Sequence, residues 1–288
     1  MGHSASGRSG TPSCEAMPLY SRAATAAATL DRHDPFPSFF DALEARHRRE
    51  LSFQEIRRAL QALSSLYVER REKMASGSAL DGAGKRAAFA LYYGPLHFLL
   101  VREIARALAP WQKAPRRLLD LGCGTGTSGA AWAHAGATPA TVAGIDSSGW
   151  AVAEARWTLR ELGVSGEVTR GDAAAAPLPR PPGGVLAAFT VNELPDEART
   201  RLLPRLLRAA ADGAPVLVVE PISRRVSPWW PEWAAAFRAA GGREDDWRFR
   251  PALPGTLALL GKAAGLDARD VTGRSLALPG ETDRGGPR

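Results

Sequence analysis

Short apolar runs alternate with stretches of helical spacing through the middle of the chain. Apolar runs bounded by turn residues are typical of strands buried in a parallel sheet, and spacing at i, i+3 and i+4 indicates the helices between them. This alternation predicts an α/β fold with a doubly wound, mostly parallel sheet that binds ligands at the carboxyl ends of its strands. The predicted strands are 118–121, 141–145, a short one near 168, 184–191 and 215–220, with helices at 150–162 and 196–211.

Helical patterns also precede this core. Ser52 and Glu55 form a predicted capping box at the start of a helix, and the pair Gly94-Pro95 is expected to break a later one. We predict helices at 39–50, from 52 through Tyr67, at 86–93 and at 97–108, which together form a helical extension or lid over residues 31–112. Residues 1–30 are expected to be disordered or a remnant of cloning, residues 113–280 to form the main domain, and residues 281–288 to be a loose tail.

The pattern loosens after residue 221. We predict a helix from 228 to 237, place Trp247 and Phe249 in a loop, and predict a further helix at 256–264. Two short strands are then expected near 268–271 and 275–278.

A glycine-rich turn follows the first core strand. Gly122, Gly124 and Gly126 alternate with other residues, whereas the dinucleotide fingerprint places its third glycine three residues after the second. Asp120 ends the strand, and its carboxylate would repel a pyrophosphate but attract an ammonium or sulfonium group. No Gly-Lys-Ser/Thr ending is present, so this is not a phosphate-binding P-loop. An adenosine ligand with a cationic tail fits, which is S-adenosylmethionine.

The side chains in and after this turn have expected roles. Cys123 needs only to be small, and Thr127 or Ser128 is expected to cap the next helix. Asp146 ends the second strand, where a carboxylate can accept from both hydroxyls of a ribose. The alternative is a helix cap, since Ser147 and Ser148 follow.

At this point the sequence resembles the class I S-adenosylmethionine-dependent methyltransferases, whose first motif is similar to residues 120–126. The resemblance implies a Rossmann-like fold with an antiparallel pair of strands at its end. It also implies that Asp146 holds the cofactor ribose, that Asp172 accepts from the adenine amino group, and that Ala173 offers its backbone N–H to the ring. The expected cofactor-binding set is Asp120, Gly122, Cys123, Gly124, Gly126, Asp146, Ser147, Asp172, Ala173, Thr190 and Asn192.

The methyl acceptor should meet the cofactor after the fourth strand. Asn192 and Glu193 are the polar groups nearest that point, and they are the candidate catalytic pair: Asn192 would orient the acceptor and Glu193 would take its proton. Either side chain could instead cap the following helix. This stretch lacks the Asn/Asp-Pro-Pro-aromatic signature of many amino-group methyltransferases. The candidate substrate contacts, which are equally compatible with a core role, are Tyr92, Tyr93, Trp229 and Trp230.

Charge adds a candidate partner. The net charge is +7, and residues 46–117 hold fifteen Arg and Lys against six Asp and Glu, a balance that favours RNA or another polyanion, or a solvated helical surface. The two cysteines, Cys14 and Cys123, make no metal or disulfide framework, so no metal is expected. No apolar run is long enough to span a membrane, and we expect a cytoplasmic protein without a membrane partner.

A second, narrower resemblance concerns substrate. Residues 63–67 with Arg70, residues 90–95, Asn192-Glu193-Leu194 and Val219-Glu220-Pro221 are similar to the small-ribosomal-subunit methyltransferase-like family, known from mitochondrial ribosome assembly. This resemblance implies an rRNA or ribosomal substrate. The alternatives are a small-molecule methyltransferase and a cofactor-binding assembly factor that does no chemistry. The sequence fixes neither the acceptor atom nor the oligomeric state.

Overall fold

A computed structural model describes residues 34–69, 80–109, 111–112, 114–136, 139–223 and 227–280. The predicted terminal segments 1–30 and 281–288, together with Cys14 and Arg70, lie outside these residues. Within them, no helix combines the length and apolar character needed to cross a membrane.

The described strands form one sheet with the order β3-β2-β1-β4-β5-β7-β6. The first five strands are parallel, and β7 runs antiparallel to both of its neighbours, β5 and β6. This confirms the doubly wound, mostly parallel fold with an antiparallel end. The strands are β1 Arg117–Leu121, β2 Thr141–Asp146, β3 Gly166–Arg170, β4 Gly183–Ala188, β5 Val216–Glu220, β6 Arg243–Phe249 and β7 Val271–Leu278.

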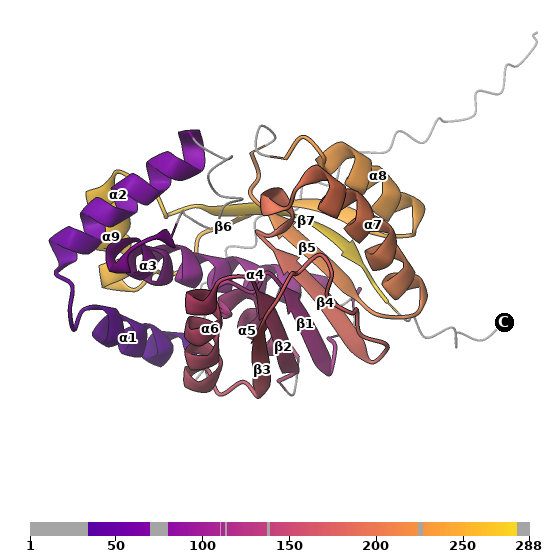
Figure 1. Cartoon of the computed structure of the whole chain (residues 1–288), viewed down its shortest axis with the longest axis horizontal. Helices are drawn as coiled ribbons and strands as arrows, with labels where there is room; N and C mark the ends of the chain where they lie inside the picture. The colour runs from indigo at the N-terminus through magenta and orange to yellow at the C-terminus, as the bar shows by residue number, and fades with distance from the viewer. Residues whose placement is uncertain are drawn as a thin grey trace, which may run out of the picture. The chain divides into compact units, whose positions relative to one another are not determined.

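Helices cover both faces of the sheet (Figure 1). Side chains alternate between the two faces of a strand, so Leu118 packs in one core and Leu119 in the other. The Leu119 face carries α7 Asp196–Ala211 and α8 Trp230–Ala239. The Leu118 face carries α1 Phe36–His47, α2 Phe53–Glu69, α3 Ala83–Ala88, α4 Gly94–Leu108, α5 Thr127–Ala133, α6 Gly149–Glu161 and α9 Gly255–Ala264.

The N-terminal helices differ from prediction at one point. The capping box is confirmed, because Glu55 accepts from the Ser52 N–H at 2.8 Å and Ser52 Oγ accepts from the Glu55 N–H. Gly94-Pro95, however, does not break the helix. A π-helical turn, Phe89–Tyr93, joins α3 to α4, and the Gly94 N–H donates to the Phe89 carbonyl five residues back. This wider register lets the chain continue through a proline that has no N–H to give.

Two predictions near the sheet edge were wrong. Trp247 and Phe249 lie in strand β6, not in a loop, and the two short strands predicted beyond 264 are one strand, β7. Strand β6 is the last of the sheet, and every second side chain is exposed and charged, which hides the apolar run expected of a strand. The fourth strand is also shorter than predicted. It ends at Ala188 because Phe189 turns into the left-handed region with φ 58°.

A buried carboxylate joins α1 to α6. Glu154 is 2% exposed, and its two oxygens lie 2.7 Å from His47 Nε2 and 3.2 Å from Arg46 Nη2. The Arg46 guanidinium also lies over the Trp157 ring, which packs against Phe39. Burial alone would raise the pKa of Glu154, but the hydrogen bond and charge of His47 and the charge of Arg46 outweigh it and lower the pKa.

We expect the substitution Glu154→Gln to reduce the free energy of unfolding by about 2–3 kcal/mol at neutral pH, because it breaks a largely buried ion-pair cluster. The folded pKa lies below the ordinary value of 4.5, so this stabilisation is complete above 4.5 and is lost as pH falls through the folded pKa. Urea unfolding at several pH values measures the difference. The control Glu44→Gln, which breaks the more exposed pair with Arg48, should cost less than about 0.5 kcal/mol. Equal losses from both variants would contradict the prediction.

Candidate cofactor and acceptor site

The site lies where the chain reverses its winding, between β1 and β4. The chain leaves β1 toward α5 on one face of the sheet and leaves β4 toward α7 on the other, so the two loops diverge above neighbouring strands. Such a switch point opens a crevice at the carboxyl ends of the strands. The glycine turn and the Asn192-Glu193 pair therefore meet here.

The glycine turn is locked against the end of β4. Gly122, Gly124 and Gly126 all have positive φ, as the sequence pattern indicated. A Cβ at position 122 would lie 2.4 Å from Thr190 Cγ2, so no other residue fits without movement. The Thr190 hydroxyl lies 2.8 Å from the Leu121 carbonyl oxygen and 3.2 Å from that of Gly122. Thr190 thus fixes the glycine turn against the end of β4.

The predicted cap of α5 was wrong. Gly126, with φ 77°, occupies the N-cap position and no side chain caps the helix, while Thr127 and Ser128 lie buried inside its first turn.

Asp146 orders the other side of the turn. Its Oδ2 accepts from the Gly124 N–H at 2.9 Å and its Oδ1 from the Ser148 N–H at 2.8 Å. Ser148 in turn caps α6 by accepting from the Ala151 N–H. Each carboxylate oxygen has a second lone pair, so Asp146 can support the turn and accept from ribose hydroxyls at once.

Space for a ligand lies beside Gly124. A Cβ at this position would meet no atom within 4 Å, and Asp146 adjoins it. An open backbone beside a carboxylate fits an adenosine with its ribose. The exposed Ser147 lies next in the chain, and its carbonyl accepts from Arg170 Nε.

Asp120 does not face a ligand directly, and this corrects the sequence argument. The side chain is 1% exposed and lies behind the turn against α5, where a Cβ at Gly129 would be 2.5 Å from Oδ2. Burial raises the pKa of Asp120 to about 8, against the opposing effect of the Gly129 N–H. Cys123 is also buried, as a small side chain filling the turn. Asp120 therefore lies behind the turn, and its raised pKa leaves it largely protonated at neutral pH.

The predicted adenine contacts follow β3. Asp172 is exposed, and its Oδ1 accepts from the Ala174 N–H at 2.9 Å in a local turn. Ala173 is buried, with 8% of its surface exposed. Both residues lie at the same edge of the sheet as Asp146, because β3 pairs in parallel with β2.

Asn192 is held by a network that the sequence did not reveal. Its backbone N–H and its Nδ2 donate to the two oxygens of Glu220, at 3.0 and 2.6 Å. Its Oδ1 accepts from Ser227 Oγ at 2.7 Å and from Trp229 Nε1 at 2.9 Å. Glu220 is fully buried at the end of β5, and burial raises its pKa to about 8, while the Asn192 N–H acts the other way. The sequence offered one signal for Glu220, which is an acidic residue at the end of an apolar run, as at Asp120.

Glu193 follows Asn192 in the chain and is exposed to solvent. Protein nevertheless surrounds its side chain closely enough to remove part of its hydration, and this raises its pKa to about 7 with a further contribution from Asp146. Asp146 is therefore near enough for its charge to act on Glu193. Among the described residues, no cluster of His, Cys, Asp and Glu suited to a metal ion is present.

The four aromatic residues that were candidate substrate contacts differ in their burial. Trp229 and Trp230 are 9% and 2% exposed and pack in the core at the start of α8, which favours the core role over stacking on a substrate. Tyr92 is also buried, close to Gly261 of α9, and burial raises its pKa to about 12. Tyr93 is half-buried and lies near His97.

His97 and Phe189 form a contact that sequence reasoning missed. Their rings stack with centroids 3.7 Å apart, which joins α4 to the end of β4. Burial lowers the pKa of His97 to about 3, so its imidazole is neutral at physiological pH.

Comparisons with known proteins agree with this geometry. A family model described as a methyltransferase domain matches residues 118–213. A proposed O-methyltransferase from Nostoc punctiforme PCC 73102 is 17% identical with a TM-score of 0.50, covering 76% of this chain and 71% of that one. No curated protein matches the sequence significantly.

Two further solved structures resemble the chain more loosely. A proposed RNA methyltransferase from Pyrococcus horikoshii is 15% identical with a TM-score of 0.43, covering 64% of this chain and 83% of that one. Magnesium protoporphyrin IX methyltransferase from Synechocystis PCC 6803, with bound SAH, is 15% identical with a TM-score of 0.43, covering 63% and 82%. The narrower resemblance to the ribosomal family stays a prediction. The glycine turn, the acid at the end of β2 and the matched family model together show that residues 118–213 form a class I methyltransferase domain, whose cofactor is S-adenosylmethionine.

Proposed function

We propose that this protein methylates a small organic acceptor, with Glu193 as the base that takes the acceptor's proton. The turn Gly122–Gly126 and Asp146 would hold the cofactor, with Asp172 toward its adenine. When bound, S-adenosylmethionine supplies a methyl group on a sulfonium, which the acceptor's lone pair takes up while the sulfur leaves as a neutral thioether. The protein then has to bind, orient and deprotonate the acceptor.

The observation that supports this proposal most strongly is the position and pKa of Glu193. It follows β4 at the switch point, and partial loss of hydration together with the charge of Asp146 raises its pKa to about 7. A base whose pKa lies near the working pH is present in its reactive form and still binds a proton well. A glutamate with an ordinary pKa would be a weaker base.

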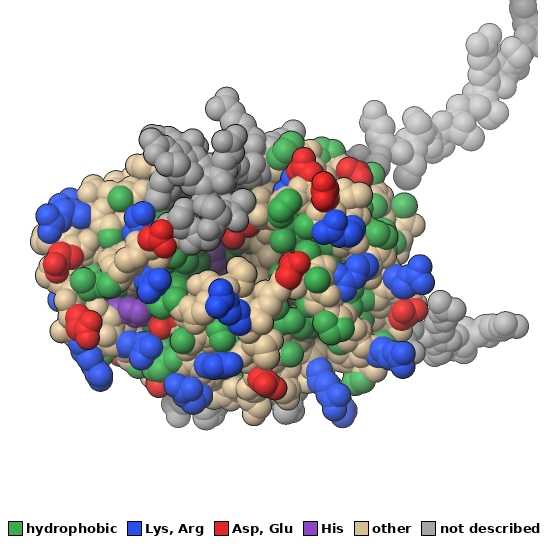
Figure 2. Space-filling model, in the orientation of Figure 1, with side chains coloured by type: hydrophobic (Ala, Val, Ile, Leu, Met, Phe, Trp, Pro, Cys, Tyr) green, Lys and Arg blue, Asp and Glu red, His purple; other side chains and the backbone are tan. Residues whose placement is uncertain are grey.

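The charges of the described residues favour a small acceptor over RNA. Asp146, Asp172 and Glu193 all lie at the carboxyl ends of their strands, where a phosphate backbone would meet like charge once Glu193 is ionised. On the face shown in Figure 2, Lys and Arg are scattered with Asp and Glu among them, and no single basic patch stands out.

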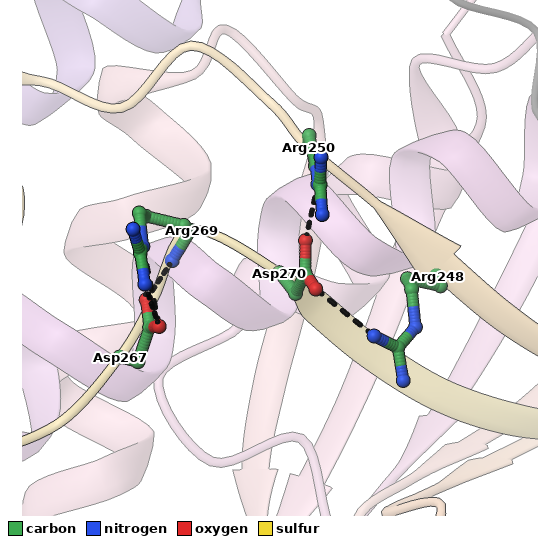
Figure 3. Close-up of polar contacts among 5 residues, drawn as sticks. All are labelled: Arg248, Arg250, Asp267, Arg269 and Asp270. Carbon is green, nitrogen blue, oxygen red and sulfur yellow. Dashed lines mark hydrogen bonds and ion pairs between the residues drawn. The ribbon is translucent and has the colours of Figure 1, made fainter.

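Some of the basic residues are also paired. In the helical extension, Arg46, Arg48, Arg102 and Arg106 form ion pairs. Outside residues 46–117, near the edge of the sheet, Arg248 and Arg250 pair with Asp270, and Arg269 pairs with Asp267 (Figure 3). An rRNA or ribosomal partner is therefore the second possibility that a methyl-transfer experiment has to distinguish.

We expect methyl-labelled S-adenosylmethionine to give labelled product in the small-molecule fraction of a cell extract separated into RNA, protein and small molecules. The variant Glu193→Gln should lower the rate about 100-fold or more, with cofactor affinity unchanged. The wild-type rate should rise with pH through about 7, because Glu193 must be ionised, and this inflection should vanish in the variant. Glu197→Gln, a 91%-exposed glutamate on the next helix, is the matched control and should change nothing.

Each other outcome counts against the proposal in its own way. Label in rRNA, with binding that weakens steeply with salt and on charge reversal at Arg57 and Arg58, would establish the RNA enzyme instead. Cofactor binding without any labelled product would indicate an assembly factor that does no chemistry.

A further inference from the structure

The amide of Asn192 has a fixed orientation. Trp229 Nε1 can only donate a hydrogen bond, so the Asn192 atom 2.9 Å from it must be the oxygen. Glu220 stands on the other side as the acceptor of Nδ2 at 2.6 Å. The assignment of oxygen and nitrogen thus follows from the partners and not from the shape of the side chain.

Both acceptor positions of this amide are already used. Ser227 Oγ at 2.7 Å and Trp229 Nε1 at 2.9 Å occupy the two lone pairs of Oδ1. The amide nitrogen carries two hydrogens and gives one to Glu220. No described residue accepts the other, and Asn192 is only partly buried. The free capacity of the side chain is therefore a single N–H donor.

We infer that Asn192 contacts the acceptor molecule as a hydrogen-bond donor only, and that Glu220 and Trp229 are the positioning residues that impose this orientation. The inference rests on the proposed function in that it places the acceptor beside Glu193. A primary amine that needs an acceptor oxygen for its hydrogens finds none on Asn192.

The arrangement specifies a class of acceptor. One atom of the substrate must accept from the Asn192 N–H, and a neighbouring hydroxyl or ring N–H must lose its proton to Glu193. The lone pair left on that atom forms the new bond to the methyl carbon. A hydroxyl or ring N–H beside a carbonyl, hydroxyl oxygen or ring nitrogen satisfies both residues.

The orientation can be tested without turnover. In protein saturated with S-adenosylhomocysteine, we expect the two Nδ2 protons of Asn192 to give separate NMR signals, one exchanging slowly with water and one fast, and the Trp229 indole N–H to exchange slowly. Two slow protons, or a fast indole N–H, would overturn the inference whether or not the protein transfers methyl groups.

Variants test the roles of the partners. Glu220→Gln replaces one acceptor oxygen by a donor, so Asn192 loses its fixed orientation, and we expect a 10- to 100-fold lower kcat with S-adenosylhomocysteine affinity within about twofold. Trp229→Phe with Ser227→Ala frees Oδ1, so the amide group can flip, and the difference in exchange rate between its two protons should disappear. An unchanged kcat in Glu220→Gln, with the amide signals intact, would show that Glu220 positions nothing.

The product decides the substrate class. Mass spectrometry should find the methyl group on an oxygen or ring nitrogen next to a hydrogen-bond acceptor. A methylated primary alkyl amine would overturn the inference while leaving the proposed small-molecule methyl transfer standing. Absence of any product would instead refute the proposed function, and the NMR result would still stand by itself.

Discussion

Replacing Gly122 with alanine should destabilise the protein by about 2–4 kcal/mol and abolish cofactor binding. The new Cβ would lie 2.4 Å from Thr190 Cγ2 and 2.5 Å from its Oγ1, and φ at this residue is +64°. Either the turn or the end of β4 must move, and both belong to the site. Chemical denaturation measures the stability, and calorimetry with S-adenosylhomocysteine measures the binding.

Gly124→Ala is the matched control for this clash. It also has positive φ, but its Cβ would meet no protein atom within 4 Å. We expect a stability loss of only about 1 kcal/mol from backbone strain, together with a clear loss of affinity because the methyl group enters the ligand's space. In the double variant Gly122→Ala with Thr190→Ser, removal of Cγ2 should recover part of the stability. No recovery, or a Gly122→Ala protein as stable as wild type, would contradict the packing argument.

Asp146→Ala should lower the affinity for S-adenosylhomocysteine at least about 100-fold. The substitution removes the acceptor for the Gly124 and Ser148 N–H groups as well as the proposed acceptor for the ribose, so turn and ligand lose the same partner. Calorimetry again gives the affinity, and circular dichroism checks the fold.

Asp172→Ala provides the comparison at the neighbouring strand. Asp172 is exposed and supports only a local turn through Ala174, so its loss should weaken binding about 10-fold or less. Equal effects at the two acids would mean that Asp146 has no special part in holding the turn.

The sequence predicted best where the backbone itself restricts the choice of residue. Gly122, Gly124 and Gly126 must adopt positive φ, and Asp146 must stop a strand beside them, so these requirements appear directly as residue types and spacing. The positions of the buried parallel strands followed from their apolar runs in the same way.

Predictions failed where distant segments decide the environment. Nothing near Trp229 in the chain shows that its indole serves Asn192, 37 positions earlier. Asp120 was predicted to contact the ligand because the local sequence does not show its burial under α5, which comes from tertiary packing. Strand β6 escaped detection because an edge strand needs no apolar run, and the π-helical turn before Gly94 has no simple pattern to announce it.

The helix continues without a break through Gly94, and this determines which part of the chain packs as one unit. A Cβ at position 94 would lie 3.1 Å from Thr125 Oγ1, so α4 begins in contact with the glycine turn, and its Phe98, Val101 and Ile104 fill the core over the sheet. The family model covers about a third of the chain and excludes this helix. The segment that the family model matches is thus shorter than the packed core, and a fragment beginning at residue 118 would leave bare the sheet face that α4 covers.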